Sequence, residues 1–136
     1  EGSEKDFLQM YIDKKNLHSF VTLKGNVSKE VMKTVYKNSH FLILPSKSEG
    51  WPKVIAEAMF WGCLPLATNV SCVASMLGYG SRGIILTENL VEDTQNSIQL
   101  LKNQNEYQHK VLEAVQWSQY FTTEKFEFEI KKVVTS

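Results

Sequence analysis

The chain has 136 residues, of which 43% are hydrophobic and 22% charged, and its fifteen basic and fifteen acidic side chains cancel. This composition is ordinary for a soluble globular protein, and the length is enough to bury a core. A balanced charge gives no support for electrostatic binding of nucleic acid or of an anionic membrane. No apolar run approaches the roughly 20 residues of a membrane span, and no signal peptide opens the chain. We therefore expect a cytoplasmic protein with one domain over residues 1–136.

Two cysteines, Cys63 and Cys72, stand in apolar surroundings, and neither belongs to a spacing typical of metal ligands. Free thiols of this kind fit a reducing cytoplasm. The three histidines are scattered, without a serine, cysteine or carboxylate at a catalytic spacing. We therefore expect neither a metal site nor a catalytic triad.

Apolar periodicity and turn residues predict alternating helices and strands. In chain order these are a helix over 5–15, a strand over 20–23, a helix over 28–38, a strand over 41–44, a helix over 52–61, a strand over 64–68, a short helix over 71–77, a strand over 83–86, and helices over 91–102, 106–120 and 123–134. Ser28 is a favourable N-cap. The continuous apolar run that ends at Pro45 is typical of a fully buried parallel strand.

Short apolar strands that alternate with helices are typical of an open, mostly parallel sheet with helices on both faces. The sequence therefore predicts an α/β fold, followed by a helical C-terminal tail. In such sheets ligands bind beyond the carboxyl ends of the strands. The loops at residues 24–27 and 45–51 occupy such positions, and we expect them to face the same ligand.

Glu49 and Glu57 stand eight positions apart in the sequence Ser-Glu-Gly-Trp-Pro-Lys-Val-Ile-Ala-Glu. Pro52 suits the first position of a helix, where its missing N–H has no partner to lose. Gly50 and Trp51 then form the turn into the helix, whose free amides and positive end favour an anion such as phosphate. Phosphate-binding amides between two carboxylates that accept from hydroxyls describe a receptor for a nucleotide-linked sugar.

Two interpretations of Glu57 remain open from the sequence. Lys53 is four residues earlier, so the two side chains can form an ion pair along the helix, worth only about 0.2–0.5 kcal/mol. Alternatively, Glu57 accepts hydrogen bonds from a diol such as a ribose. Lys53 lies near the positive end of the helix, where a cation is disfavoured unless an anion binds there.

The order of four segments resembles a known family. Residues 21–27 read Val-Thr-Leu-Lys-Gly-Asn-Val, residues 62–68 read Gly-Cys-Leu-Pro-Leu-Ala-Thr, and residues 41–46 and 49–57 lie between them. This order resembles the C-terminal, donor-binding half of retaining GT-B glycosyltransferases, the family called glycosyl transferases group 1. The resemblance implies a Rossmann-like sheet and a nucleotide-diphosphate sugar as donor substrate. It also implies transfer with retention of configuration, without a metal or another cofactor.

The resemblance assigns the site residues one by one. Glu49 matches the first glutamate of the motif, which contacts hydroxyls of the donor sugar, and is the candidate catalytic residue. Glu57 matches the glutamate that holds the ribose. The residues implied to bind the donor are Gly25, Asn26 and Val27 at the nucleobase, and Ser48, Glu49, Gly50, Trp51, Pro52, Lys53 and Glu57 at the sugar, diphosphate and ribose.

The chain departs from the family in several places. The arginine and lysine that form the catalytic pair have no counterpart, and neither does the acceptor-binding N-terminal domain, the natural partner of this half. Residues 71–75 replace a Gly-Gly pair and a later glutamate. We therefore expect a fragment that lacks its first βα unit and second strand, and is inactive alone. We also expect the strand at 20–23 to pair with 41–44, or to exchange in a dimer through the exposed sheet edge.

The intact protein is then expected to transfer a sugar in polysaccharide or glycoconjugate synthesis, at the inner face of a membrane. Two alternatives remain. One is a GT-B enzyme that epimerises a nucleotide sugar. The other is a non-catalytic α/β interaction domain in which the glutamates are merely solvated.

Overall fold

The computed structural model of the chain describes residues 2–135, which divide between Lys33 and Thr34 into two compact units. The first unit contains α1 (Lys5–Lys14), which confirms the first predicted helix. The division falls within α2 (Lys29–Lys37). The hydroxyl of Ser28 accepts a hydrogen bond from the backbone N–H of Val31 at 3.3 Å, so Ser28 caps α2 as predicted.

The strand predicted at residues 20–23 is wrong. The backbone N–H groups of Phe20 and Val21 both donate to the carbonyl of Leu17, so this segment turns back on the end of α1. The side chain of Phe20 is 85% exposed. A strand exists only where its backbone groups have a neighbour to pair with. None of the three strands in residues 2–135 pairs with this segment, so the expected pairing with residues 41–44 is also wrong.

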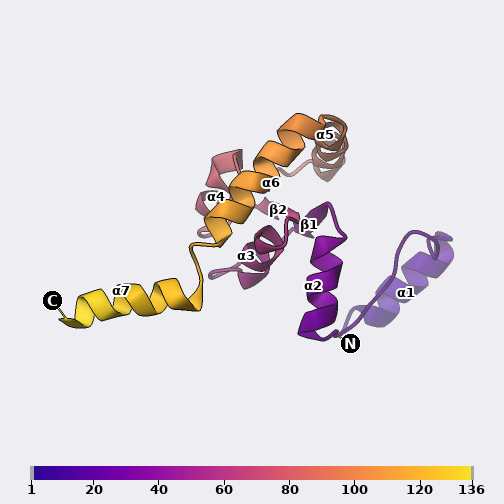
Figure 1. Ribbon diagram of the computed structural model, residues 1–136. Helices are drawn as coiled ribbons and strands as arrows, with labels where there is room; N and C mark the ends of the chain where they lie inside the picture. The colour runs from indigo at the N-terminus through magenta and orange to yellow at the C-terminus, as the bar shows by residue number, and fades with distance from the viewer. Residues whose placement is uncertain (1, 136) are drawn as a thin grey trace. The chain divides into compact units, whose positions relative to one another are not determined.

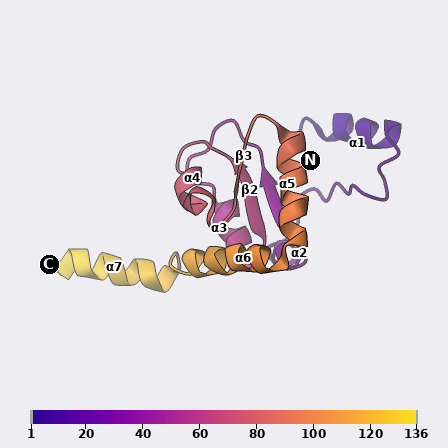
Figure 2. The same cartoon turned by 90° about the horizontal axis from the view of Figure 1, so that it is seen from above.

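The second unit is built on a parallel sheet in the order β1-β2-β3. The strands are β1 (Phe41–Leu44), β2 (Leu64–Thr68) and β3 (Ile84–Leu86), with Phe41 opposite Leu64 and Leu66 opposite Ile84. Figure 2 shows the three strands side by side, with α3, α5 and α6 around them. The expected α/β fold with a parallel sheet is therefore confirmed.

The helices of this unit follow the prediction closely. They are α3 (Lys53–Phe60), α4 (Val73–Met76), α5 (Leu90–Lys102), α6 (Gln104–Ser118) and α7 (Thr123–Thr135), with a short 3-10 turn, η1, at Gly78–Gly80. The helix predicted over 71–77 is thus shorter than expected. Pro52 lies one position earlier than expected, because its extended backbone (ψ 96°) makes it the N-cap of α3.

The central strand β2 carries the core. Leu64 to Ala67 are all buried, and because successive side chains point to opposite faces, both faces of β2 are covered. Ile55, Ala58 and Met59 pack one side of α3 against the same core. By contrast, β1 is an edge strand whose Ile43 is 59% exposed, so the prediction of a fully buried strand is wrong.

The last helix, α7, has no buried residue, and Figure 1 shows it beyond the loop that follows α6. No helix among residues 2–135 is both long and apolar enough to cross a membrane.

Candidate site at the carboxyl ends of the first two strands

Two loops meet beyond the carboxyl ends of β1 and β2. The first, residues 45–52, links β1 to α3, and the second, residues 69–72, links β2 to α4. Ser71 Oγ and Cys72 Sγ both donate to the carbonyl oxygen of Gly50, at 3.1 Å and 3.3 Å. The hydroxyl of Thr68, at the end of β2, donates to the carbonyl of Ser46. Three side chains from one segment thus hold two carbonyls of the first loop.

The backbone amides of the first loop are free. Within residues 2–135, no N–H from Ser46 to Trp51 donates a hydrogen bond to another group of the chain. The loop leads into α3, whose N-cap Pro52 provides no side-chain acceptor and whose first turn has no acidic residue. Unpartnered amides at the positive end of a helix form a site for an anion.

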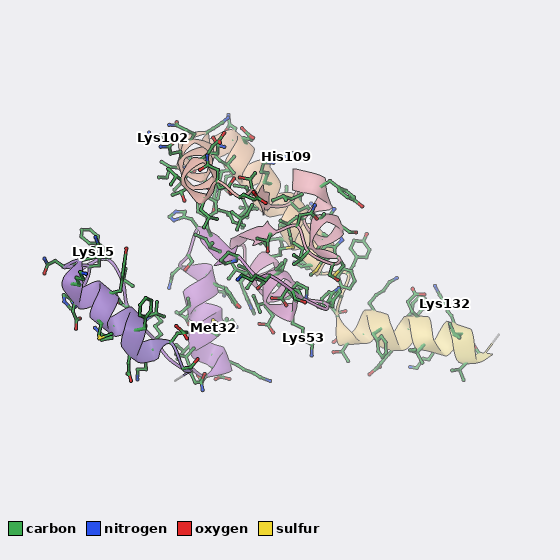
Figure 3. The ribbon with its side chains drawn as sticks, turned by 180° about the vertical axis from the view of Figure 1, so that it is seen from behind. Lys15, Met32, Lys53, Lys102, His109 and Lys132 are labelled. Atoms are coloured by element: carbon green, nitrogen blue, oxygen red, sulfur yellow. The ribbon has the colours of Figure 1, made fainter. Side chains whose placement is uncertain are left out.

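The two glutamates of the motif flank this end of α3. Glu49 is half-buried in the loop, and Glu57 is exposed on the second turn of the helix. Among the described residues, neither carboxylate has a hydrogen-bond or ion-pair partner. In particular, the ion pair between Lys53 and Glu57, one of the two interpretations left open by the sequence, does not form among the described residues. Both side chains are exposed on α3, and Lys53 is labelled in Figure 3. Both carboxylates are therefore available to hydroxyl donors from outside the chain.

A cavity of about 320 Å³ runs along the exposed face of α3. Trp51, Lys53 and Glu57 line it, together with Ala56, Phe60 and Trp61 on the α3 side, Ser118 at the end of α6 and Phe121 in the loop that follows α6. The ring of Trp51 lies 5.8 Å from that of Phe121, centroid to centroid, at an interplanar angle of 53°. The cavity thus has aromatic walls with one carboxylate and one ammonium group at its rim.

Glu57 also acts on its surroundings. Burial raises the pKa of the Tyr36 phenol above its ordinary value, and the charge of Glu57 adds to that rise. No group of three or more His, Cys, Asp or Glu side chains within residues 2–135 is arranged to hold a metal ion.

The predicted site residues are divided between the two units. Ser48, Glu49, Gly50, Trp51, Pro52, Lys53 and Glu57 all belong to the second unit, whereas Gly25, Asn26 and Val27 belong to the first. Gly25 has φ +60° and lines a separate cavity of about 390 Å³ within the first unit, with Thr22 to Lys24 and Gly2 to Lys5.

Sequence reasoning missed the residues that contact the first loop from outside it. Residues 71–75 were noted only as the place where the family has a Gly-Gly pair, and the contact of Ser71 and Cys72 with Gly50, more than twenty residues earlier, was not predicted. One signal was available, because the loops after neighbouring parallel strands emerge at the same edge of a sheet. Phe121 also lines the cavity, and no sequence feature indicated that it would lie there.

Comparison with known proteins shows which family and which proteins this chain resembles. The sequence model of the family described as "Glycosyl transferases group 1" matches residues 1–116. An uncharacterised glycosyltransferase from Methanocaldococcus jannaschii is 28% identical over 127 residues, which cover 93% of this chain and 36% of that protein.

Two solved structures have the same fold. Sucrose-phosphate synthase from Thermosynechococcus elongatus matches with a TM-score of 0.82 and 20% identity, over 98% of this chain and 34% of that one. The pneumococcal O-GlcNAc transferase GtfA, solved with UDP and GlcNAc, matches with a TM-score of 0.76 and 21% identity, over 98% of this chain and 28% of that one. This chain therefore spans about a third of the length of each relative.

Proposed function

The chain belongs to the Glycosyl transferases group 1 family, and from this premise we propose that residues 45–57 hold part of a nucleotide-sugar donor. In the whole protein, this site serves transfer of the sugar to an acceptor with retention of configuration. The observation that carries the proposal is the first loop. Its amides have no partner among residues 2–135, and it opens on an uncapped helix end between two unpartnered carboxylates.

The parts of the donor match the parts of this site. The diphosphate lies against the amides around Gly50 and Trp51 and the first turn of α3, where the helix dipole favours negative charge. Lys53, exposed in that turn, adds a positive charge that the helix end alone would disfavour. Glu49 accepts hydrogen bonds from hydroxyls of the sugar, and Glu57 accepts from the two hydroxyls of the ribose.

This arrangement also defines what the segment contributes to the reaction. When the bond between sugar and diphosphate breaks, negative charge grows on the leaving diphosphate. Amides and a helix end that are already oriented stabilise such charge without reorganisation. The nucleobase contact at Gly25, Asn26 and Val27 is proposed from the family resemblance. The basic pair and the acceptor site are proposed to lie on parts of the whole protein outside these 136 residues, which leaves this chain able to bind but not to transfer.

The test is a set of affinities measured by titration with UDP, GDP and ADP and with a nucleotide sugar of each. Glu57→Ala should weaken binding of the preferred nucleotide about tenfold or more, since a hydrogen bond to a charged group contributes about 1.5–3 kcal/mol. Glu49→Ala should weaken binding of the nucleotide sugar but leave that of the nucleoside diphosphate unchanged. The two variants thus separate the ribose role from the sugar role.

Glu127→Ala is the matched control, because Glu127 is an exposed glutamate on α7, away from the loop. Equal affinities of the parent and of Glu57→Ala for every nucleotide would remove the ribose role from Glu57.

A further inference from the structure

The conformation of the first loop depends on side chains from another part of the chain. Within residues 2–135 the amides from Ser46 to Trp51 make no hydrogen bonds that would hold the loop from inside. The two hydrogen bonds from Ser71 Oγ and Cys72 Sγ to the Gly50 carbonyl, together named here the Gly50 anchor, attach the middle of the loop to the turn after β2.

The Gly50 anchor fixes the orientation of the whole peptide group between Gly50 and Trp51, including the N–H of Trp51. A trans peptide group is planar, and its C=O and N–H point in opposite directions. The described residues contain no cis peptide bond, so the N–H of Trp51 points away from the turn that holds the Gly50 oxygen. That N–H donates to nothing in the described part of the chain and lies two residues before α3. The anchor therefore sets the direction of one free amide at the anion-binding end of the helix.

The backbone of Ser71 is unusual in a way that serves this contact. Its φ is +50°, in the left-handed region that costs a residue other than glycine about 1–2 kcal/mol. Such strain persists where the surrounding structure imposes it, and it concentrates at functional sites. Here the left-handed residue is the one whose hydroxyl reaches Gly50, although the side chain itself is exposed and adds little to the core.

We propose that Ser71, assisted by Cys72, is a positioning residue of the donor site: it holds the Gly50–Trp51 peptide so that the Trp51 N–H faces the diphosphate of the bound donor. This inference rests on the proposed function and deepens it. Ser71 touches no part of the donor and acts through the backbone of the first loop.

The decisive variant is Ser71→Gly, because glycine removes the hydroxyl and at the same time relieves the left-handed strain. If Ser71 had only a structural role, Ser71→Gly would leave the affinity for the nucleoside diphosphate unchanged. We expect Ser71→Gly to keep the urea midpoint of the parent, and to weaken binding of the nucleoside diphosphate about three- to tenfold, the effect of one lost hydrogen bond. Binding of the nucleoside without phosphate should not change.

A second measurement needs no ligand. In the ¹H–¹⁵N spectrum of the free protein, Ser71→Gly should move the Trp51 amide resonance, because the hydrogen bond at the carbonyl of the same peptide group is lost. Replacing Cys72 by serine in the Ser71→Gly background supplies a new hydroxyl beside the same carbonyl, and should restore both the resonance and the affinity. Ser75→Ala is the control, since Ser75 is exposed on α4 and its hydroxyl bonds to no described residue.

The outcomes are distinguishable. A Ser71→Gly protein whose Trp51 resonance or diphosphate affinity matches the parent would overturn the positioning role. A parent that binds none of the nucleotides would contradict the proposed function itself and would reduce the Gly50 anchor to a structural contact.

Discussion

Lys53 and Glu57 lie one turn apart on α3, and their side chains test the first of the two interpretations of Glu57, the ion pair along the helix. An exposed ion pair along a helix would be worth only a few tenths of a kcal/mol. The structure shows no such pair, and both side chains are exposed beside a cavity with aromatic walls. Neither charge is used by an ion pair within the described residues, so both stay available to a ligand, as the proposed function requires.

Cys63 shows the opposite situation, a titratable group that belongs to the core. The residue is 1% exposed, and burial raises the pKa of its thiol to about 11. In the unfolded chain the thiol loses its proton near its ordinary pKa, about 8.5–9. Between pH 9 and pH 11 the folded state therefore holds a proton that the unfolded state has lost, so the free energy of unfolding falls as pH rises through this range.

Urea denaturation at intervals from pH 7 to pH 11 checks this prediction. Cys63→Ala should lower stability at every pH, because it leaves a cavity in the core, but should show a shallower loss above pH 9. Cys72→Ala, at the half-buried thiol, should keep the steep loss of the parent. Burial also raises the pKa of Tyr36 and Tyr107, so part of the slope remains in every variant. Equal slopes for the parent and Cys63→Ala would contradict the assignment.

Helix α3 is the element that positions the site, and both of its ends are defined by local chemistry. Pro52 begins it, and at its other end the N–H of Gly62 donates to the carbonyl of Met59 while the N–H of Cys63 donates to that of Ala58. This pair of bonds is the Schellman motif, which requires a left-handed residue after the C-cap. Gly62 provides it, with φ +78°.

Gly62→Ala should therefore lower the free energy of unfolding by about 1–2 kcal/mol, because alanine in the left-handed region is strained. Crowding would add little, since a Cβ at this position meets its nearest neighbour, Val111 Cγ1, at an ordinary 3.7 Å. Gly50→Ala is the comparison, because its Cβ would meet nothing within 4 Å and its φ is not left-handed. Equal urea midpoints for Gly62→Ala and the parent would show that the motif does not hold the end of α3.

Elements with strong local signals could be predicted from the sequence, and those that depend on a distant partner could not. Proline, glycine and a capping serine mark the ends of α2 and α3, and both lie close to where they were expected. Residues 20–23 have the composition of a strand but pair with no strand among residues 2–135. For the same reason the sequence did not reveal that β1 is an edge strand, since its apolar run reads like a buried one.

The candidate site likewise has one part that the sequence predicted and one part that it could not predict. The loop over residues 45–51 was predicted where the structure has it, beyond the carboxyl end of β1, because this position follows from the order of strand and helix. The contacts of Ser71 and Cys72 with Gly50 could not be predicted, because they depend on how two loops distant in sequence meet after folding.

At the scale of the whole molecule, the two units differ in how much core they contain. Ile12 is the only buried apolar side chain of the first unit among the described residues, while the second unit holds the sheet and the main core. The proposed donor contacts are divided between them. The residues for the sugar, diphosphate and ribose belong to the well-packed unit, and the proposed nucleobase contacts belong to the other.

The most direct test of the donor site is to map a nucleoside diphosphate on the ¹⁵N-labelled chain by amide chemical shifts. The preferred nucleotide should give its largest shifts between Glu49 and Glu57, with Trp51 and Lys53 foremost, and smaller shifts at residues 25–27. Inorganic pyrophosphate should move the amides at the start of α3 but not that of Glu57. Shifts confined to α7 or to the far end of α5, or none at millimolar nucleotide, would contradict a donor site at the first loop.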